Sequence, residues 1–191
     1  AFRDIMVDYS YTECTSACLQ ALETAQQRFP GFLTGQIERA KQRGQQFLRT
    51  KQREDGSWEG SWAVCFTYGT WFGVWGLLAT GVPADAPAIQ KACAFLLAHQ
   101  HQDGGWGEHY QSCLQRCYVD HPSSQAVQTA WALMTLCKAG HAQHPAAHRA
   151  ARFLVQRQQA DGDWPREAMV GVFNKTTLIN YENFDAPSAF E

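Results

Sequence analysis

The 191-residue sequence lacks any apolar run near the length of about 20 residues that a membrane-spanning helix needs. It also lacks a charge excess, because 16 cationic and 18 acidic side chains leave a net charge of only -2. A nearly neutral chain gives no electrostatic reason to expect a nucleic-acid partner. The first eleven residues show no charged segment followed by an apolar one, so we identify no targeting sequence there. These absences argue against a transmembrane protein, and they leave attachment to a membrane surface open.

The cysteines do not suggest a disulfide framework. There are seven, and an odd number without a secretory signal favours a reducing compartment. Cys113 and Cys117 form a single spaced pair with no histidine at ligand spacing, so we expect neither a metal site nor a cofactor. His99 and His101 are expected at the solvent-exposed end of a helix.

No useful length of strand-like alternation occurs, whereas apolar residues recur at helical spacing in six segments. These segments are 10–28, 36–51, 67–80, the one that follows Asp85 and contains Pro87, 124–138 and 146–158. Asp85 is expected to cap the fourth of them. Residues 105–122 read as a long loop. The pattern predicts an all-α protein built from pairs of helices.

A cassette of 16 residues occurs three times, at 43–58, 91–106 and 149–164. Each copy ends one helix with Phe-Leu, places a Gln at its C-terminus, turns at Asp-Gly and closes with Trp. We expect the indole N–H to bind backbone, so that these residues staple the fold and take no part in chemistry. A second, more apolar helix follows each Trp, which predicts part of an α-α barrel, or toroid, of outer and inner helices. The staple residues are Gln52, Trp58, Gln100, Trp106, Gln158 and Trp164.

The repeated Gln and Gly-x-Trp elements resemble the QW motif of the triterpene cyclases, the squalene–hopene and oxidosqualene cyclases. Residues 4–17, 55–73 and 164–181 are similar to the C-terminal part of an oxidosqualene cyclase, most of all to the lanosterol-forming enzymes of animals. The resemblance extends from residue 2 to residue 181. It implies that 1–181 form a partial C-terminal α-α barrel and that 182–191 are an atypical tail.

The resemblance implies the cyclisation of (3S)-2,3-oxidosqualene to a tetracyclic sterol precursor. Aromatic faces stabilise the migrating carbocation in such enzymes, each contributing about 0.5–2 kcal/mol. Trp62 is the strongest candidate, because the other cassettes carry Tyr110 and Ala168 at its position; the alternative is that it only packs the loop. Phe173 resembles a second cation-stabilising residue of the family. The remaining positions that match the cavity wall are Ile179, Tyr181 and Phe2.

Cys14 resembles the family cysteine that hydrogen-bonds the catalytic acid, although a small buried apolar residue is the alternative interpretation. The acid itself has no counterpart, since neither an Asp-Cys-Thr-Ala-Glu motif nor the Asp-rich motif of squalene–hopene cyclases occurs. Asp8 and Glu13 are the carboxylates near the matched segments. We therefore expect a fragment that is inactive alone. The family's membrane-binding helix is not in this chain; the resemblance nevertheless implies monotopic association with the cytosolic face of the endoplasmic reticulum or lipid droplets.

Three hypotheses remain open on the sequence. The first is a catalytic-barrel wall of an oxidosqualene cyclase with an isoprenoid substrate. The second is a truncated, non-catalytic helical module that binds an isoprenoid or another protein. The third is a protein prenyltransferase β subunit, which would need an Asp, Cys and His set around zinc.

Overall fold

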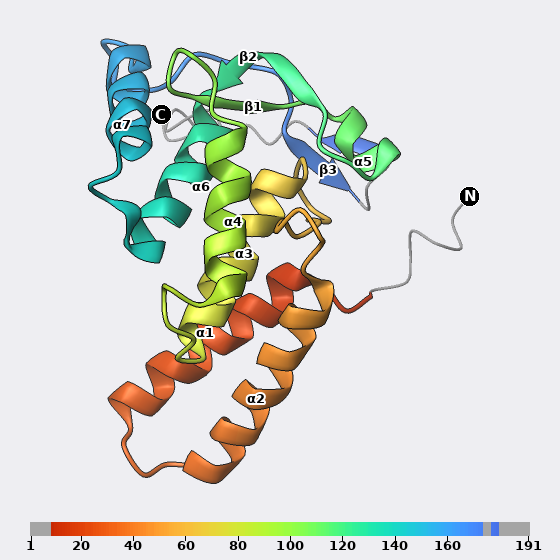
Figure 1. The fold of residues 1–191 in the computed structure, drawn as a ribbon, viewed down its shortest axis with the longest axis vertical. Helices are drawn as coiled ribbons and strands as arrows, with labels where there is room; N and C mark the ends of the chain where they lie inside the picture. Colours follow the sequence, from red (N-terminus) through yellow and green to blue (C-terminus); the bar gives the residue numbers. More distant parts are fainter. Residues whose placement is uncertain (1–8, 174–176, 180–191) are drawn as a thin grey trace.

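The computed structural model describes residues 9–173 and 177–179, and it is mainly helical (Figure 1). The helices are α1 (Thr12–Arg28), α2 (Thr34–Lys51), α3 (Phe66–Ala79), α4 (Pro87–Ala98), α5 (Gln111–Gln115), α6 (Ala126–Leu136), the π-helical turn η1 (Cys137–His141) and α7 (Pro145–Arg157). The strands are β1 (Trp106–Glu108), β2 (Asp120–Gln125), β3 (Gly171–Phe173) and β4 (Thr177–Ile179). Within these ranges, no helix combines the length and the apolar character that crossing a bilayer requires.

The long helices form three consecutive pairs: α1 with α2, α3 with α4, and α6 with α7 (Figure 1). The first member of each pair is the inner helix, and α3 packs against both α1 and α6. The second member lies on the outside. This arrangement confirms the predicted all-α class and the predicted arc of an α-α barrel.

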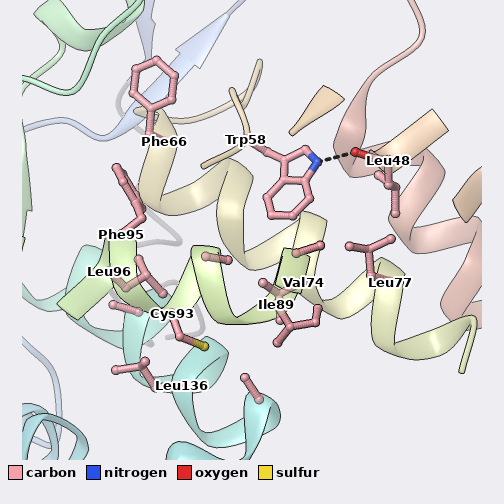
Figure 2. Packing of buried hydrophobic residues seen from close by; sticks show 14 of the residues in the cluster. Leu48, Trp58, Phe66, Val74, Leu77, Ile89, Cys93, Phe95, Leu96 and Leu136 are labelled. Atoms are coloured by element: carbon pink, nitrogen blue, oxygen red, sulfur yellow. Dashed lines mark hydrogen bonds between the residues drawn. The ribbon is translucent and has the colours of Figure 1, made fainter. Parts of the chain in front are cut away.

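The staple of each cassette is a hydrogen bond from the tryptophan indole to the backbone ten residues earlier. Nε1 donates to the carbonyl oxygen of Leu48, Leu96 and Leu154 at 2.7, 2.7 and 2.9 Å from Trp58, Trp106 and Trp164, respectively. Figure 2 shows the first of these bonds. The ring therefore closes the end of its own outer helix, as the spacing of the cassette predicts.

The cassette glutamine connects neighbouring repeats as well as closing its own turn. Gln52 Nε2 donates to the carbonyl of Gly56 at 3.0 Å and to that of Ala88 at 2.7 Å. Gln100 repeats both bonds, to Gly104 and Ala146, each at 2.8 Å. Ala88 and Ala146 are the second residues of α4 and α7. Each glutamine thus ties its turn to the start of the next outer helix.

The third cassette has the same local turn, but no described residue packs on that turn as the next outer helix packs on the first two. Gln158 Nε2 donates to the carbonyl of Gly162 at 2.7 Å, and Gly162 has a φ of 94°. A Cβ atom on Gly56 would lie 2.4 Å from the carbonyl oxygen of Lys91, whereas one on Gly162 would meet nothing within 4 Å among the described residues. Trp164 is accordingly half-buried, in contrast to the fully buried Trp58.

The hydrophobic core lies between the inner and outer helices (Figure 2). It centres on the Trp58 ring, which α3 approaches closely: a Cβ on Gly73 would lie 2.3 Å from the indole, so glycine is required there. The same cluster includes side chains of α2, α3, α4 and α6, namely Leu48, Val74, Leu77, Ile89, Phe95, Leu96 and Leu136. Burial on several sides explains why α3 is apolar nearly all round.

Two sequence-based expectations about local structure are wrong. Asp85 does not cap α4, because the helix begins at Pro87 with Ala86 as its N-cap and no side-chain capping bond. Proline at the first helical position has a preset φ and no N–H to satisfy, so the helix can start there without a cap. The loop 105–122 also contains structure, with β1 paired antiparallel to β2 and the short helix α5 between them.

The histidines at the end of α4 are not solvated surface residues. His101 is half-buried and lies 2.8 Å from Asp120 Oδ1 through Nε2 and 2.9 Å from Ser124 Oγ through Nδ1. His99 packs its ring 3.9 Å from that of Tyr118, centroid to centroid. Both rings therefore hold β2 and the residues just before it against the second cassette.

Candidate active site

Trp62 and Phe173 are brought together by the fold. Their ring centroids are 5.3 Å apart with an interplanar angle of 62°, an edge-to-face contact. Tyr11, the residue before α1, adds its ring 6.1 Å from Trp62 at 77°. Trp62 and Phe173 are half-buried and so retain exposed aromatic surface. Sequence analysis predicted two members of this group and missed Tyr11, which belongs to no cassette.

Backbone pairing with the C-terminal hairpin places the Trp62 segment. Val172 N donates to the carbonyl of Trp62 at 3.1 Å, and Val64 N donates to the carbonyl of Val170 at 2.8 Å. Ala63 forms an isolated antiparallel bridge with Gly171. In the β3–β4 hairpin, Ile179 is directly opposite Gly171, so this predicted cavity residue lies one strand away from the Trp62 segment.

A buried carboxylate holds the same segment from the other side. Glu13 is 5% exposed, and its Oε1 accepts hydrogen bonds from the backbone N–H of Ser61 at 2.5 Å and of Trp62 at 3.3 Å. Gln128, on α6, donates from Nε2 to the carbonyl of Val64 at 2.6 Å. The Trp62 segment is therefore positioned by α1, α6 and β3 together, with the buried Glu13 carboxyl bonded to its backbone.

Glu108 caps the start of α3, the inner helix that follows Trp62. It is 1% exposed, and its carboxylate accepts from the N–H groups of Phe66 and Thr67, each at 2.9 Å. A negative charge at a helix N-terminus is stabilised by the free N–H groups and the helix dipole. Burial raises the pKa of the Glu108 carboxyl above its usual value, and the backbone donors oppose that rise.

Glu167 repeats this arrangement one pair further along. Its Oε2 accepts from Ala126 N, the first residue of α6, at 2.5 Å, and its Oε1 lies 2.8 Å from Arg157 Nη2. Glu108, just after the second cassette, thus caps α3, and Glu167, just after the third cassette, caps α6. Sequence analysis missed these caps because Glu108 is two residues after its tryptophan and Glu167 is three, so the repeat alignment does not superimpose them.

Replacing Glu108 by glutamine tests its ionisation. Because the folded-state pKa is raised, the stability that Glu108 contributes is complete below the unfolded value of 4.5 and is lost as the pH rises through the higher folded value. The glutamine keeps an acceptor without charge. We expect Glu108→Gln to lie within about 1 kcal/mol of the native chain at low pH and to improve relative to it as the pH rises. Denaturant unfolding at stepped pH measures this; a difference independent of pH would contradict it.

An aromatic group lines the inner helices beyond the Trp62 pair. Trp71 and Trp131 stack with centroids 6.2 Å apart and an interplanar angle of 13°, and Tyr68 is 5.0 Å from Trp131. Phe72 and Trp75 extend the group along α3. The aromatic richness of residues 67–75 signals part of this group, whereas Trp131 joins it only through packing of α6 on α3.

The cysteines have different environments. Cys14 is exposed on the first turn of α1, so the interpretation as a buried apolar residue is wrong, and its role beside an acid stays a prediction. Cys113 is buried while Cys117 is exposed. The neighbouring Cys113 thiol and burial together raise the pKa of Cys65, so the Cys65 thiol is neutral. Phe2 and Tyr181 lie outside the described residues.

Chemically, this arrangement offers electron-rich ring faces held by a rigid frame. Aromatic faces attract cations without forming bonds to them, and preorganised groups of this kind stabilise charge that develops during a reaction. Within residues 9–173 and 177–179, no group of three or more His, Cys, Asp or Glu side chains is arranged to bind a metal ion. The described frame is thus suited to stabilising cations along an apolar molecule.

Comparison with known proteins agrees with this geometry. Residues 1–188 match the family model of the squalene-hopene cyclase C-terminal domain. Mouse lanosterol synthase is 46% identical over 187 residues, and cycloartenol synthase of Dictyostelium discoideum is 47% identical over 184; each alignment covers 96% of this chain. The chain spans about a quarter of these relatives, 26% of their length.

A solved structure extends the comparison to the fold. The ent-copalyl diphosphate synthase from Streptomyces platensis superimposes with a TM-score of 0.64 at 21% identity, over 88% of this chain and 30% of that one. At this identity the likeness concerns the fold alone. The repeated staples, the aromatic wall and the match over nearly the whole length lead to one conclusion: the chain belongs to the squalene-hopene cyclase C-terminal domain family of the terpene cyclases.

Proposed function

We propose that this chain forms one wall of the reaction cavity of an oxidosqualene cyclase, which converts (3S)-2,3-oxidosqualene to a tetracyclic sterol precursor. The observation that carries this assignment is the Trp62–Phe173 pair, 5.3 Å apart and held from three elements. The names of the mouse and Dictyostelium relatives support the substrate class. Location at the endoplasmic reticulum or lipid droplets stays a prediction.

The reaction needs an acid to open the epoxide and then a surface that tolerates carbocations. Trp62 would face an early ring cation, and Phe173 a later one at the stage of C-ring closure. Each ring face is worth about 0.5–2 kcal/mol to a cation, with the larger values in a dry site. Because 1.4 kcal/mol corresponds to tenfold in rate, the position of each ring biases which carbon bears the charge. Tyr11 contacts the Trp62 ring edge to face, with the centroids 6.1 Å apart.

The proton donor is assigned to a segment that this sequence does not contain, because the Asp-Cys-Thr-Ala-Glu motif is missing from it. We propose that Cys14, which is exposed at the start of α1, is the partner of such an acid. We therefore expect the purified 191-residue chain to give no cyclised product from oxidosqualene. Gas chromatography with mass detection measures this. Lanosterol or another cyclic triterpenoid above the level of a protein-free control would contradict it.

A chimera tests the proposed function with the acid present. The 187 aligned residues of mouse lanosterol synthase are replaced by those of this chain, and sterol formation is measured against the unmodified mouse enzyme. We expect cyclisation, and the product reports whether this wall directs the cation to lanosterol or to another tetracycle. A chimera that folds but forms no cyclic product would reject the assignment and favour the non-catalytic module.

Two alternatives to the cyclase wall were open on the sequence: a non-catalytic module and a prenyltransferase β subunit. The non-catalytic module is the alternative that the chimera distinguishes from the cavity wall. The prenyltransferase hypothesis is not supported, because the chain belongs to the terpene cyclases.

A further inference from the structure

The β1–β2 hairpin, at the top of Figure 1, is fastened to the second cassette by a polar network. His101 lies 2.8 Å from Asp120 Oδ1 through Nε2 and 2.9 Å from Ser124 Oγ through Nδ1. Ser124 Oγ donates to Asp103 Oδ1 at 2.7 Å. We name these four residues the His101 network. It connects the turn of the cassette to the beginning and the end of β2.

The hydrogen bonds of the network determine where its protons lie. An ionised carboxylate can only accept, so the contact with Asp120 needs a proton on Nε2 of His101. Ser124 has a single hydroxyl proton, which goes to Asp103, so Ser124 Oγ can only accept from Nδ1. Both ring nitrogens therefore donate, and only the cationic imidazolium can do this.

A neutral ring cannot satisfy the same three contacts. With the proton on Nδ1, the lone pair of Nε2 would face the carboxylate of Asp120 at 2.8 Å. With the proton on Nε2, Ser124 would have one proton for two acceptors, Nδ1 and the carboxylate of Asp103. Loss of the His101 proton thus removes one hydrogen bond and the charge that pairs with Asp120.

The ring of His101 is held in place, whereas the side chain of Asp120 has room to leave it. His101 N donates to the carbonyl of Gly105 at 2.9 Å, and a Cβ atom on Gly107 would lie 3.3 Å from Cε1 of the ring. The side chain of His101 is 18% exposed, but that of Asp120 is 64% exposed. Ser124 is buried. Release of the network therefore frees the Asp120 end of β2 first.

The same position of the first cassette also carries a cation. Arg53 stands in the first cassette where His101 stands in the second. Its Nε lies 3.9 Å from Asp55 Oδ2, and Asp55 is the counterpart of Asp103. Arginine stays charged, whereas histidine exchanges its proton between about pH 5 and 8. The two cassettes thus hold the same place with a permanent cation and a titratable one.

Other titratable groups lie on the elements around the network. Besides the two aspartates they are Glu108 and His109 at and after the end of β1, Tyr118 and His121 before and within β2, and His99 at the end of α4. His109 and His121 stack with ring centroids 5.8 Å apart, and burial raises the pKa of Glu108. These groups can also respond to pH, so a test of His101 needs variants that share them.

The network is connected to the cap of α3. Asp120 lies opposite Glu108 in the β1–β2 ladder, and Glu108 accepts from the first N–H groups of that helix. Ser124 precedes Gln125, whose Oε1 accepts from Glu108 N at 3.3 Å. Opening of the network therefore loosens the strand pairing that carries the cap.

We propose that the His101 network is a proton-dependent clasp, which holds β2 on the second cassette when His101 is protonated and releases the Asp120 end of the hairpin when it is not. Because the folded network uses the proton, the stability that it contributes is present at low pH and is lost as the pH rises. The window is about pH 5–8, in which imidazoles exchange their proton. The clasp does not depend on the proposed cyclisation.

His101→Arg and His101→Gln are the deciding variants. Arginine keeps its charge throughout, as Arg53 does in the first cassette, so we expect the hairpin to stay closed from about pH 5.5 to about pH 8. Glutamine has no charge, so the hairpin should be equally loose at both ends of this range. The native chain should resemble His101→Arg at the lower pH and His101→Gln at the higher pH. The expected loss of protection is about fivefold, as for an ion pair with one exposed partner.

The measurement is hydrogen exchange of residues 117–125 in the 191-residue chain, with each rate divided by its intrinsic rate at that pH. Residues 52–58, which contain Arg53 and no histidine, are the internal control and should not change. Glu108 is present in all three chains, so its titration cancels. His109→Gln with His121→Gln should leave the pH dependence intact. Should His101→Gln not fold, Asp120→Asn, at an exposed position, should abolish the pH dependence instead.

Nitrogen NMR of the histidine rings gives a second readout, because it follows the ring protons of His101 directly. We expect His101 to lose one ring proton over the same pH range in which residues 117–125 lose protection. The clasp is rejected if these two changes occur at different pH values, or if the native chain keeps the same protection throughout. It is also rejected if His101→Arg retains the pH dependence of the native chain.

Discussion

Replacing Trp58 by alanine is expected to lower the free energy of unfolding by about 3–5 kcal/mol. The side chain is fully buried, and α3 packs so closely on it that Gly73 has no room for a Cβ. Alanine leaves a cavity that this tightly fitted helix cannot fill by small shifts. It also removes the indole donor from the carbonyl of Leu48. Denaturant unfolding followed by circular dichroism measures the loss, which is a large share of the stability of a typical domain.

Trp164→Ala is the matched control for this effect. Its indole makes the equivalent hydrogen bond, to Leu154 at 2.9 Å, at the same place in the cassette. It is only half-buried, because the described residues include no further outer helix over it. We expect a loss of about 1–2 kcal/mol, which corresponds to the hydrogen bond and partial burial. Equal losses at the two positions would show that local stapling, and not enclosure by α3, determines the contribution of Trp58.

The cassettes show what is predictable from sequence and why. The indole bond joins residues ten positions apart, so its spacing is written in each copy and repeats three times. The second bond of Gln52, to Ala88, spans 36 residues and leaves no local trace. Repetition indicates that a staple exists, whereas the helix that it reaches is determined by the packing of one repeat on the next.

The caps of the inner helices were missed for a related reason. Glu108 reaches back 42 residues to Phe66, and Glu167 reaches back 41 residues to Ala126. Both cap an inner helix, but they lie at different distances after their cassettes, so aligning the copies does not superimpose them. Buried carboxylates are rare unless they are paired or hydrogen-bonded. A glutamate two or three residues after a cassette tryptophan is the signal in the sequence for such caps.

Predicting the candidate site from the sequence required two kinds of information. The divergence of the cassettes at Trp62 is visible in the sequence, but nothing local connects it to Phe173, 111 positions further along. Family resemblance linked the two residues, and the pairing of β3 with the Trp62 segment supplies the physical connection. Tyr11 was not predicted, because only the packing of α1 against the same segment brings its ring to Trp62. Cys14 is exposed, which contradicts its interpretation as a buried apolar residue.

Trp62→Ala, made in the chimera with mouse lanosterol synthase, is expected to slow cyclisation and to release early-terminated cyclic products. Loss of one cation–π contact of about 0.5–2 kcal/mol corresponds to a rate reduction of about 2- to 30-fold. The change in products follows from the same loss. A cation that is no longer stabilised at one ring stage is deprotonated there more often than it proceeds. Product analysis by gas chromatography and a rate per folded enzyme are the two measurements.

Trp62→Phe and Trp75→Ala provide the controls that separate cation stabilisation from packing. Phenylalanine keeps a weaker aromatic face at the same place, so it should retain most of the rate and the native product pattern. Trp75 is half-buried like Trp62 but lies in the C-terminal half of α3, where Lys138 packs on its ring at 5.2 Å. Its replacement should change stability without changing the products. If Trp62→Ala left both rate and product pattern unchanged, its contact with Phe173 would be structural, and the cavity wall would have to be sought at Tyr68, Trp71 and Trp131.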